Sequence, residues 1–188
     1  LKAWIPFYRE TIDTANSGGV NYNIYSREMD SLHTVRVAEN VYLRKDWIDT
    51  MYKRILQSEL GPIGKYVYSD NDYIFLGKIV EEISGMPLDE YVRKTFYDKL
   101  DLKYTGFKPR ERFPVSYIAP TENEALFRQQ LIRGDVHDPG AAMFGGVAGH
   151  AGLFSNAYEL AVLSQVLVNG GVLNGHNFFK RSTIRFFT

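Results

Sequence analysis

The chain has 188 residues, of which 45% are hydrophobic and 14% aromatic, and this suffices for one globular domain with a buried core. Lys plus Arg and Asp plus Glu number 22 each, so no excess charge points to nucleic acid or to an anionic membrane. No apolar run approaches the roughly 18 residues of a transmembrane helix, and the absence of cysteine excludes disulfides, thiolate metal sites and cysteine nucleophiles. Because the chain starts at Leu1 without a methionine or a signal peptide, we expect it to be part of a longer protein.

The first sixty residues are predicted to hold short strands and one helix. Turn residues and aromatic side chains fill the first forty positions, and strand-like runs occur at 20–25 and 34–43. Asp46 is a suitable N-cap for a helix whose apolar residues recur at helical spacing, and Gly61 and Pro62 end that helix.

The strongest helical signal lies in the middle of the chain. Asp70 or Asn71 can cap a helix in which apolar side chains repeat every three or four residues until Gly85 ends it. Pro87 occupies the favoured first position of a further helix, whose apolar face continues to Leu100.

The second half of the chain begins with an irregular stretch, because prolines and glycines are scattered through residues 109–149. A loop of that length in a compact domain usually carries function or encloses a site. Asn156 and Glu159 have the spacing of a capping box at the start of another helix, and residues 169–171 end it. Residues 180–188 begin one more helix, so the chain is predicted to be mainly α with a few short strands.

Tyr68 and Asp70, at the start of the central helix, form the first candidate site. A tyrosine held at such a junction can transfer a proton when a nearby cation lowers its pKa, and an aspartate two residues on can orient a lysine or a substrate amide. The simpler interpretation is structural, with Asp70 as a helix cap and Tyr68 as an aromatic side chain at the boundary.

Longer motifs surround this pair in a fixed order. They are Tyr-Ser-Asp at 68–70, Ser-Gly-Met-Pro at 84–87, Leu-Asp-Leu-Lys-Tyr-Thr-Gly-Phe at 100–107, Gly-Asp-Val-His-Asp at 134–138 and Gly-His-Ala-Gly-Leu-Phe-Ser at 149–155. In these motifs the chain resembles the serine β-lactamase and penicillin-binding-protein-like superfamily, especially its class C β-lactamase, esterase and D-aminopeptidase branch. The resemblance implies the helical lobe of the α/β β-lactamase/transpeptidase-like fold.

The resemblance also implies acyl transfer to a serine. The family uses a Ser-x-x-Lys nucleophile motif, a Tyr-x-Asn motif and a Lys/His-Thr-Gly strand near the C-terminus. Tyr68 matches the tyrosine that carries a proton between nucleophile and leaving group, and Asp70 matches the asparagine that holds the motif lysine and touches the substrate amide. An aspartate departs from the family pattern and favours the protonated form of a neighbouring lysine.

Two of the three family motifs do not occur in the chain. No serine is followed three positions later by lysine, and the single Thr-Gly, at Thr105, matches a structural turn of the family. We therefore expect a partial domain truncated at both ends, with residues 1–59 as a poorly matched N-terminal part and 60–188 as the helical lobe and one wall of a cleft. Without a nucleophile, such a fragment is expected to be inactive alone.

Histidines in the stretch 137–152 form the second candidate site. His137, Asp138 and His150 suggest either a metal site or a His–Asp pair. Their spacing matches no metal-ligand motif, so we expect no metal, and a glycine-flanked histidine is more often a loop residue bonded to backbone. The glycines are not a phosphate loop, because no Lys-Ser/Thr follows them. The family resemblance places this stretch along the substrate cleft, which makes His150 and Gly152 candidate cleft residues.

Together these observations predict a fragment of a serine hydrolase that cleaves an amide or ester in cell-wall metabolism, in the periplasm or otherwise outside the cytoplasm. The expected partner is a small-molecule, peptide or ester substrate, with no cofactor, nucleic acid or membrane span. Segment 137–152 also resembles Bacteroidetes-type chains in which such a domain follows a family 3 glycoside hydrolase. The alternative is a degenerate module that binds peptidoglycan or a partner without catalysis. Apolar surface exposed on an isolated lobe predicts a homodimer.

Overall fold

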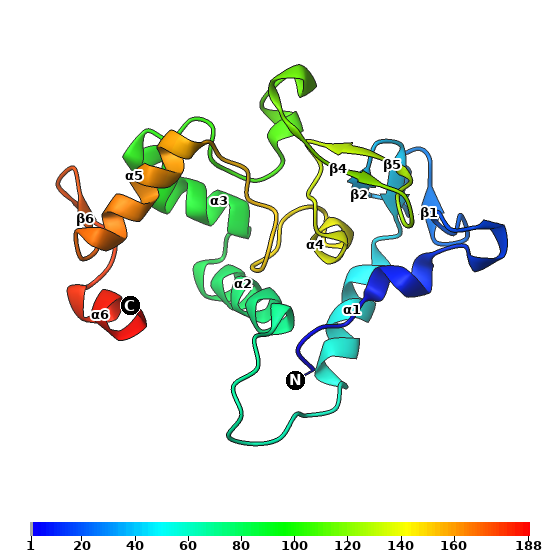
Figure 1. The fold of residues 1–188 in the computed structure, drawn as a ribbon, viewed down its shortest axis with the longest axis horizontal. Coiled ribbons are helices and arrows are strands. Elements are labelled where there is room, and N and C mark those ends of the chain that lie inside the picture. Colours follow the sequence, from blue (N-terminus) through cyan, green and yellow to red (C-terminus); the bar gives the residue numbers. More distant parts are fainter. Residues whose placement is uncertain (1) are drawn as a thin grey trace.

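A computed structural model describes residues 2–188 (Figure 1). The α-helices are α1 (Asp46–Leu56), α2 (Asp70–Ser84), α3 (Leu88–Val92), α4 (Pro139–Met143), α5 (Ala157–Val168) and α6 (Arg181–Phe187). The strands are β1 (Tyr25–Ser26), β2 (Val35–Ala38), β3 (Val41–Leu43), β4 (Pro120–Glu124), β5 (Gln130–Arg133), β6 (Val172–Leu173) and β7 (His176–Asn177). Helical residues outnumber strand residues, as the sequence predicted. None of the helices in the described part of the chain has the length and apolarity needed to cross a membrane.

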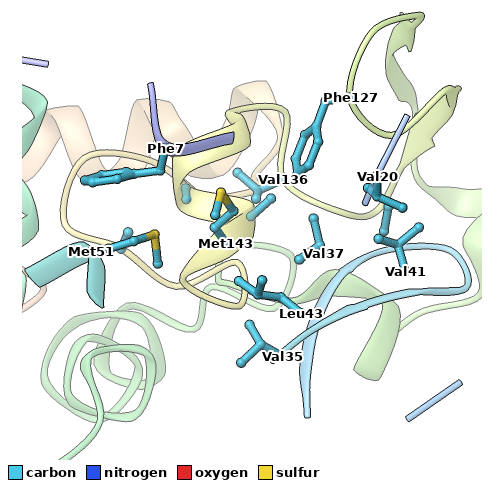
Figure 2. Packing of buried hydrophobic residues seen from close by; sticks show 14 of the residues in the cluster. Phe7, Val20, Val35, Val37, Val41, Leu43, Met51, Phe127, Val136 and Met143 are labelled. Atoms are coloured by element: carbon cyan, nitrogen blue, oxygen red, sulfur yellow. The ribbon is translucent and has the colours of Figure 1, made fainter. Parts of the chain in front are cut away.

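The larger of two apolar cores lies where a three-stranded antiparallel sheet packs against α1 and α4 (Figure 2). The strand order is β1-β3-β2, and alternate residues of β2 and β3 face inward. Val37 and Leu43 from these strands meet Met51 of α1 and Met143 of α4, all at most 1% exposed. This core occupies the end of the molecule that holds the N-terminal strands (Figure 1).

A smaller core joins the helices at the other end of the molecule. Its buried members are Tyr97, Leu100, Leu102 and Val166. Val166 comes from α5, while the other three follow α3, so this core fixes α5 against the segment that leads out of α3.

The start of α2 differs from the predicted cap. Ser69, rather than Asp70 or Asn71, caps the helix, and its hydroxyl accepts a hydrogen bond from the Asp72 N–H at 3.1 Å. Asp70 is the first helical residue, and the buried Asn71 side chain instead donates to the carbonyl of Lys2. The C-terminal prediction is confirmed, since Gly85 ends the helix at φ 67°.

The helices on either side of α2 also differ in detail from prediction. Lys45 stands at the cap position of α1 and Asp46 is the first helical residue. Pro87 caps α3 instead of opening it, and α3 is followed by a π-helical turn, Arg93–Tyr97, and a 3-10 turn that reaches Leu100. The single helix predicted from 87 to 100 is therefore three successive helical geometries, although its apolar face does reach Leu100 as predicted.

The predictions made from turn residues and apolar runs are partly wrong. Residues 20–25 form no continuous strand, since only Tyr25 belongs to β1 and Val20 makes an isolated bridge with Ile12. The run at 34–43 is a hairpin whose turn contains Asn40 at φ 52°. The stretch 109–149, predicted to lack long regular elements, holds only short ones: two 3-10 turns, the β4–β5 hairpin and α4.

A buried ion pair holds the β4–β5 hairpin to the loop that follows it. Glu124 accepts hydrogen bonds from the backbone N–H groups of residues 126–128. The fully buried Arg128 side chain contacts Glu124 and donates to the carbonyl oxygens of Val136 and His137, each at 2.7 Å. Burial of both charges is tolerated because each has several hydrogen-bond partners. The pair thereby sets the path of residues 136–137.

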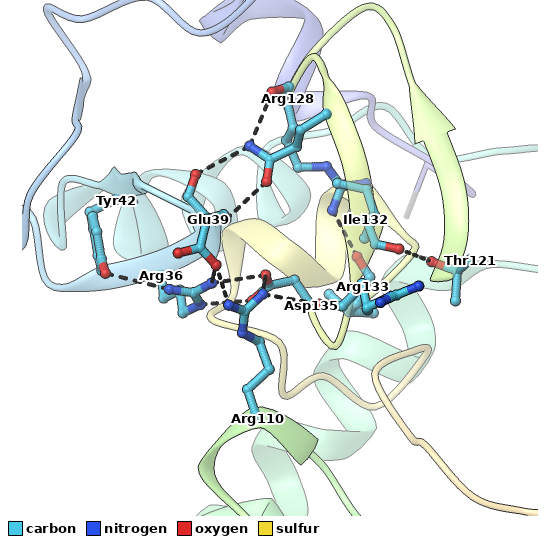
Figure 3. A network of polar contacts seen from close by, with 11 residues as sticks. Arg36, Glu39, Tyr42, Arg110, Thr121, Arg128, Ile132, Arg133 and Asp135 are labelled. Carbon is cyan, nitrogen blue, oxygen red and sulfur yellow. Dashed lines mark hydrogen bonds and ion pairs between the residues drawn. The ribbon is translucent and has the colours of Figure 1, made fainter. Parts of the chain in front are cut away.

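A second polar network lies beside this pair at the surface (Figure 3). Arg36 of β2 binds both carboxylate oxygens of Asp135, at 2.8 and 3.0 Å. Arg110 reaches the same carboxylate at 3.3 Å and also pairs with Glu39. The Asp135 side chain is only 11% exposed, and the bidentate geometry fixes residue 135 between the β2–β3 hairpin and the 3-10 turn Pro109–Glu111.

Residues 144–152 lie directly on α2 through a contact between two glycines. A Cβ atom on Gly149 would stand 1.9 Å from the carbonyl oxygen of Tyr73. A Cβ atom on Gly77, one turn along the helix, would stand 3.1 Å from the Gly149 nitrogen. The two backbones touch only because neither residue has a side chain.

We expect Gly149→Ala to push this loop off α2 and to lower the free energy of unfolding by about 2 kcal/mol or more, because backbone atoms cannot yield as a flexible side chain does. Urea denaturation followed by circular dichroism measures the change. Gly61→Ala is the matched control, since nothing lies within 4 Å of an added Cβ there, and it should shift stability by less than about 1 kcal/mol. Equal effects of the two substitutions would contradict this role of Gly149.

Candidate functional site

Tyr68 and Asp70 lie where an exposed connection enters α2. Residues 59–68 are exposed throughout, and the Tyr68 side chain is 60% exposed with its ring centroid 5.8 Å from that of Tyr73. Asp70 is partly buried in the first helical turn, where the positive end of the helix dipole stabilises a carboxylate. Neither the Tyr68 hydroxyl nor the Asp70 carboxylate has a hydrogen-bond partner within residues 2–188.

His150 and Gly152 line a cavity of about 1090 Å³. Its walls come from four separate segments of the chain. The lining residues are Tyr104, Pro109, Phe113, Tyr117, Ile118, Ala119, Thr121, Val136, His137, Asp138, His150, Ala151, Gly152, Leu153, Phe154, Ser155 and Asn156. Tyr68 and Asp70 are not among them, so the structure does not bring the two candidate sites into one cavity.

A histidine–aspartate pair lines this cavity. The His150 side chain is 4% exposed, and its Nε2 lies 3.0 Å from Asp138 Oδ1. Burial acts to raise the pKa of Asp138, but hydrogen bonds from His150 and from the Ala141 N–H outweigh it and bring that pKa below its ordinary value. Asp138 is therefore a carboxylate at neutral pH. From sequence a His–Asp pair was one possibility and a histidine bonded to backbone was favoured; the structure shows the side-chain partner.

His137, the other histidine of this stretch, also lines the cavity but takes a different partner. It is largely exposed and lies 3.5 Å from Glu122. Across residues 2–188, no three His, Cys, Asp or Glu side chains are grouped so that they could hold a metal ion. The arrangement offers an ionised carboxylate, an imidazole and an apolar wall, which suits hydrogen bonding and apolar contact with an organic group.

The sequence predicted a helix-cap role for Glu159 and gave no sign that its buried carboxylate binds the chain around Tyr104, a residue of the cavity wall. The carboxylate oxygens accept hydrogen bonds from the backbone N–H groups of residues 103–105, at 2.6 to 3.1 Å, and from the Thr105 hydroxyl at 2.6 Å. The predicted Asn156 cap is confirmed, because its side chain accepts from the Glu159 N–H at 2.8 Å. The capping-box spacing was the available signal, but the carboxylate binds a distant turn rather than the helix start. This contact fixes Tyr104 in the cavity wall.

Glu159→Gln should lower the free energy of unfolding at pH 7 by about 2 to 3 kcal/mol, because an amide cannot accept from every donor around it. Burial acts to raise the pKa of Glu159, but the Thr105 hydroxyl and the backbone N–H groups outweigh it and place that pKa below the ordinary 4.5. The stabilisation is therefore complete above pH 4.5 and disappears as the pH falls through the lower, folded-state pKa.

Urea denaturation of both proteins between pH 3 and pH 7 tests this, and the difference between them should shrink at the acid end. Glu82→Gln is the control, since its exposed pair with Lys78 should leave the midpoint nearly unchanged. A difference that is constant across the pH range would contradict the assigned role.

Comparison with known proteins shows the family of the chain. The chain belongs to the Beta-lactamase family, which matches residues 16–183. A protein of Salmonella typhi named "Putative D-alanyl-D-alanine carboxypeptidase" is 43% identical over 142 residues, which are 69% of this chain and 33% of that protein. The protein of the same name in Salmonella schwarzengrund is 44% identical over 142 residues, with the same coverage. The chain thus spans a third of the length of these relatives.

Solved structures give a more distant likeness. D-amino acid amidase from Ochrobactrum anthropi SV3 is 16% identical, with a TM-score of 0.49 over 67% of this chain and 33% of that one. The octameric penicillin-binding protein homologue from Pyrococcus abyssi is 18% identical, with a TM-score of 0.45 over 68% and 26%. The resemblance to serine hydrolases of this superfamily predicted from sequence is confirmed by the family match.

Proposed function

We propose that this chain is the helical lobe and cleft wall of a serine hydrolase that acts by acyl transfer on an amide or ester, with D-amino-acid cell-wall peptides as the preferred substrate class. The observation that carries the proposal is the family match over residues 16–183, together with Tyr68 and Asp70 at the start of α2. The names of the relatives, which refer to D-alanyl-D-alanine carboxypeptidases, support the substrate class.

In this proposal Tyr68 carries a proton between the nucleophile and the leaving group. Its exposed hydroxyl, unpaired within residues 2–188, is available for that role. Asp70 holds the lysine of the nucleophile motif and receives the substrate amide. His150 and Gly152 belong to the wall along which the substrate lies.

The nucleophile itself lies outside these 188 residues, because no serine here is followed three positions later by lysine. The chain alone is therefore expected to be inactive. In this proposal residues 60–188 form the helical lobe. Residues 1–59 form the N-terminal part of the domain, which matches the family motifs least. The fusion behind a family 3 glycoside hydrolase and the extracytoplasmic location stay predictions.

A serine-reactive fluorophosphonate tests the proposal when intact mass is measured on the full-length gene product and on this chain side by side. We expect one adduct on the full-length protein and none on the chain. Tyr68→Phe should slow labelling by about 100-fold, since loss of a positioned proton carrier typically costs that much. Tyr66→Phe, at an 89% exposed neighbouring tyrosine, is the matched control and should label at the wild-type rate.

The rival function is a binding module without catalysis, and the aspartate at position 70 favours it. Asp70→Asn restores the family residue and should leave labelling intact or faster if the protein is an enzyme. An unlabelled full-length protein would leave peptidoglycan or partner binding as the function, and a labelled chain would mean that the nucleophile lies within residues 1–188.

Self-association follows from the apolar face of α2. Tyr73, Leu76, Ile79 and Ile83 are between 43% and 82% exposed and recur at helical spacing on this helix. We expect the chain to dimerise through this face. Light scattering should give twice the monomer mass for the wild type and the monomer mass for Leu76→Glu, whereas a compact wild-type monomer would contradict the dimer.

A further inference from the structure

The buried stripe of α2 begins with a polar residue. The buried residues of this helix are Asn71, Ile74 and Gly77, which recur every three positions and therefore share one face. Ile74 joins the larger core and Gly77 meets Gly149. Asn71, 1% exposed, instead donates a hydrogen bond from its side-chain amide to the Lys2 carbonyl. A hydrogen bond is directional, so this contact specifies where the start of the helix lies.

The main chain that Asn71 binds is itself held from a second side. The Lys2 N–H donates to the Ser58 hydroxyl at 2.9 Å, and that hydroxyl donates to the Ile55 carbonyl of α1 at 2.7 Å. Five residues further along the same segment, Phe7 is 2% exposed and belongs to the larger core. Residue 2 is therefore a fixed point, and Asn71 ties the start of α2 to it.

Tyr68 and Asp70 take their positions from this helix start. Asp70 directly precedes the asparagine, and the Tyr68 ring lies against the Tyr73 ring in the next turn of α2, with centroids 5.8 Å apart. The connection that leads to them gives no comparable support, because residues 59–68 are exposed throughout. A displacement of the helix start would thus displace both candidate catalytic side chains.

The two buried side chains at this helix start have different tasks. The Ser69 hydroxyl accepts from the Asp72 N–H, which secures the first turn of α2 itself. The Asn71 amide crosses 69 positions of the chain, which secures the place of that turn relative to the N-terminal segment. An asparagine suits this task, because an ionised aspartate only accepts hydrogen bonds and cannot donate to a carbonyl.

We propose that Asn71 is a positioning residue for the proton transfer assigned to Tyr68, and that it acts by holding the start of α2 to the main chain of residue 2. Its part in the reaction rests on the proposed function, whereas its hold on the helix start does not. The amide is used by the Lys2 carbonyl, so Asn71 acts through Tyr68 and Asp70 and not on the substrate.

The rate of fluorophosphonate labelling of the full-length gene product tests the part in the reaction. Asn71→Leu keeps a side chain of similar size and removes the donor, so it should slow labelling by about 10-fold, since small displacements of a catalytic group cost at least that much. Asn123→Ala, at an exposed asparagine of β4, is the control and should label at the wild-type rate.

A double substitution separates positioning from general damage to the fold. If Asn71 acts through the Tyr68 hydroxyl, Asn71→Leu should slow labelling no further once Tyr68→Phe has removed that hydroxyl. Multiplication of the two single effects would contradict the proposal, as would wild-type labelling of Asn71→Leu alongside slow labelling of Tyr68→Phe.

Amide hydrogen exchange on the 188-residue chain tests the hold on the helix start without any catalysis. The Ile74 N–H pairs with the Asp70 carbonyl in the α-helical pattern, so its exchange reports opening of the first turn. Asn71→Leu should speed this exchange about fivefold, the usual contribution of one hydrogen bond, and leave the Val166 N–H of α5 unchanged. Equal acceleration at both amides, or none at Ile74, would overturn the role of Asn71.

Ser58→Ala is the second variant, because it removes the other hydrogen bond to residue 2 and leaves the buried asparagine in place. It should speed Ile74 exchange and slow labelling in the same direction as Asn71→Leu, and it decides if the latter does not fold. A full-length protein that is not labelled contradicts the proposed function, and Ile74 exchange then still supports or overturns the hold on the helix start. Labelling that Tyr68→Phe slows and Asn71→Leu does not contradicts only this inference.

Discussion

The contact between Gly149 and helix α2 is the constraint on which the arrangement of the molecule depends. It brings the backbone of one segment onto the carbonyl of Tyr73 and the turn at Gly77, without intervening side chains. On one side of this contact Ala148 and Ile74 join the larger core. On the other side the chain continues directly into His150, whose buried imidazole binds Asp138.

The walls of the cavity are held mainly by polar contacts to backbone. Glu159 binds the N–H groups of residues 103–105, and Glu124 with Arg128 fixes residues 126–128 and the carbonyl groups of 136 and 137. In both cases one carboxylate satisfies several backbone donors in a segment that has no regular hydrogen bonding of its own. Such contacts specify a single loop path, whereas apolar side chains tolerate sliding. The site is therefore built on loops yet has defined walls.

Local signals predicted the helices well and the tertiary contacts poorly. The Asn156 cap and the Gly85 terminus follow from short-range backbone chemistry, which a sequence displays directly. The cap of α2 was misplaced by one or two residues because Ser69, Asp70 and Asn71 can all accept from the first turn, and their surroundings decide between them.

The other errors have long-range causes. The β4 strand reads Pro-Thr-Glu-Asn-Glu and is largely exposed, so it carries no apolar alternation to predict it. The pairing of Asp138 with His150 spans 12 positions of irregular chain, and no local pattern predicts such a contact. Tyr68 and Asp70 were placed by family motifs, and their separation from the His150 cavity became visible only in three dimensions.

Asn156 makes a local contact and Glu159 a long-range one, and this difference has a consequence for the order of folding. The asparagine nucleates α5 from neighbouring residues, but the glutamate reaches a turn 54 to 56 positions earlier in the chain. Closing so long a loop costs conformational entropy before the contact it makes can contribute any stabilising free energy. The helix can thus form early while its docking waits for the chain between residues 105 and 155 to collapse, which makes this wall of the cavity a late event in folding.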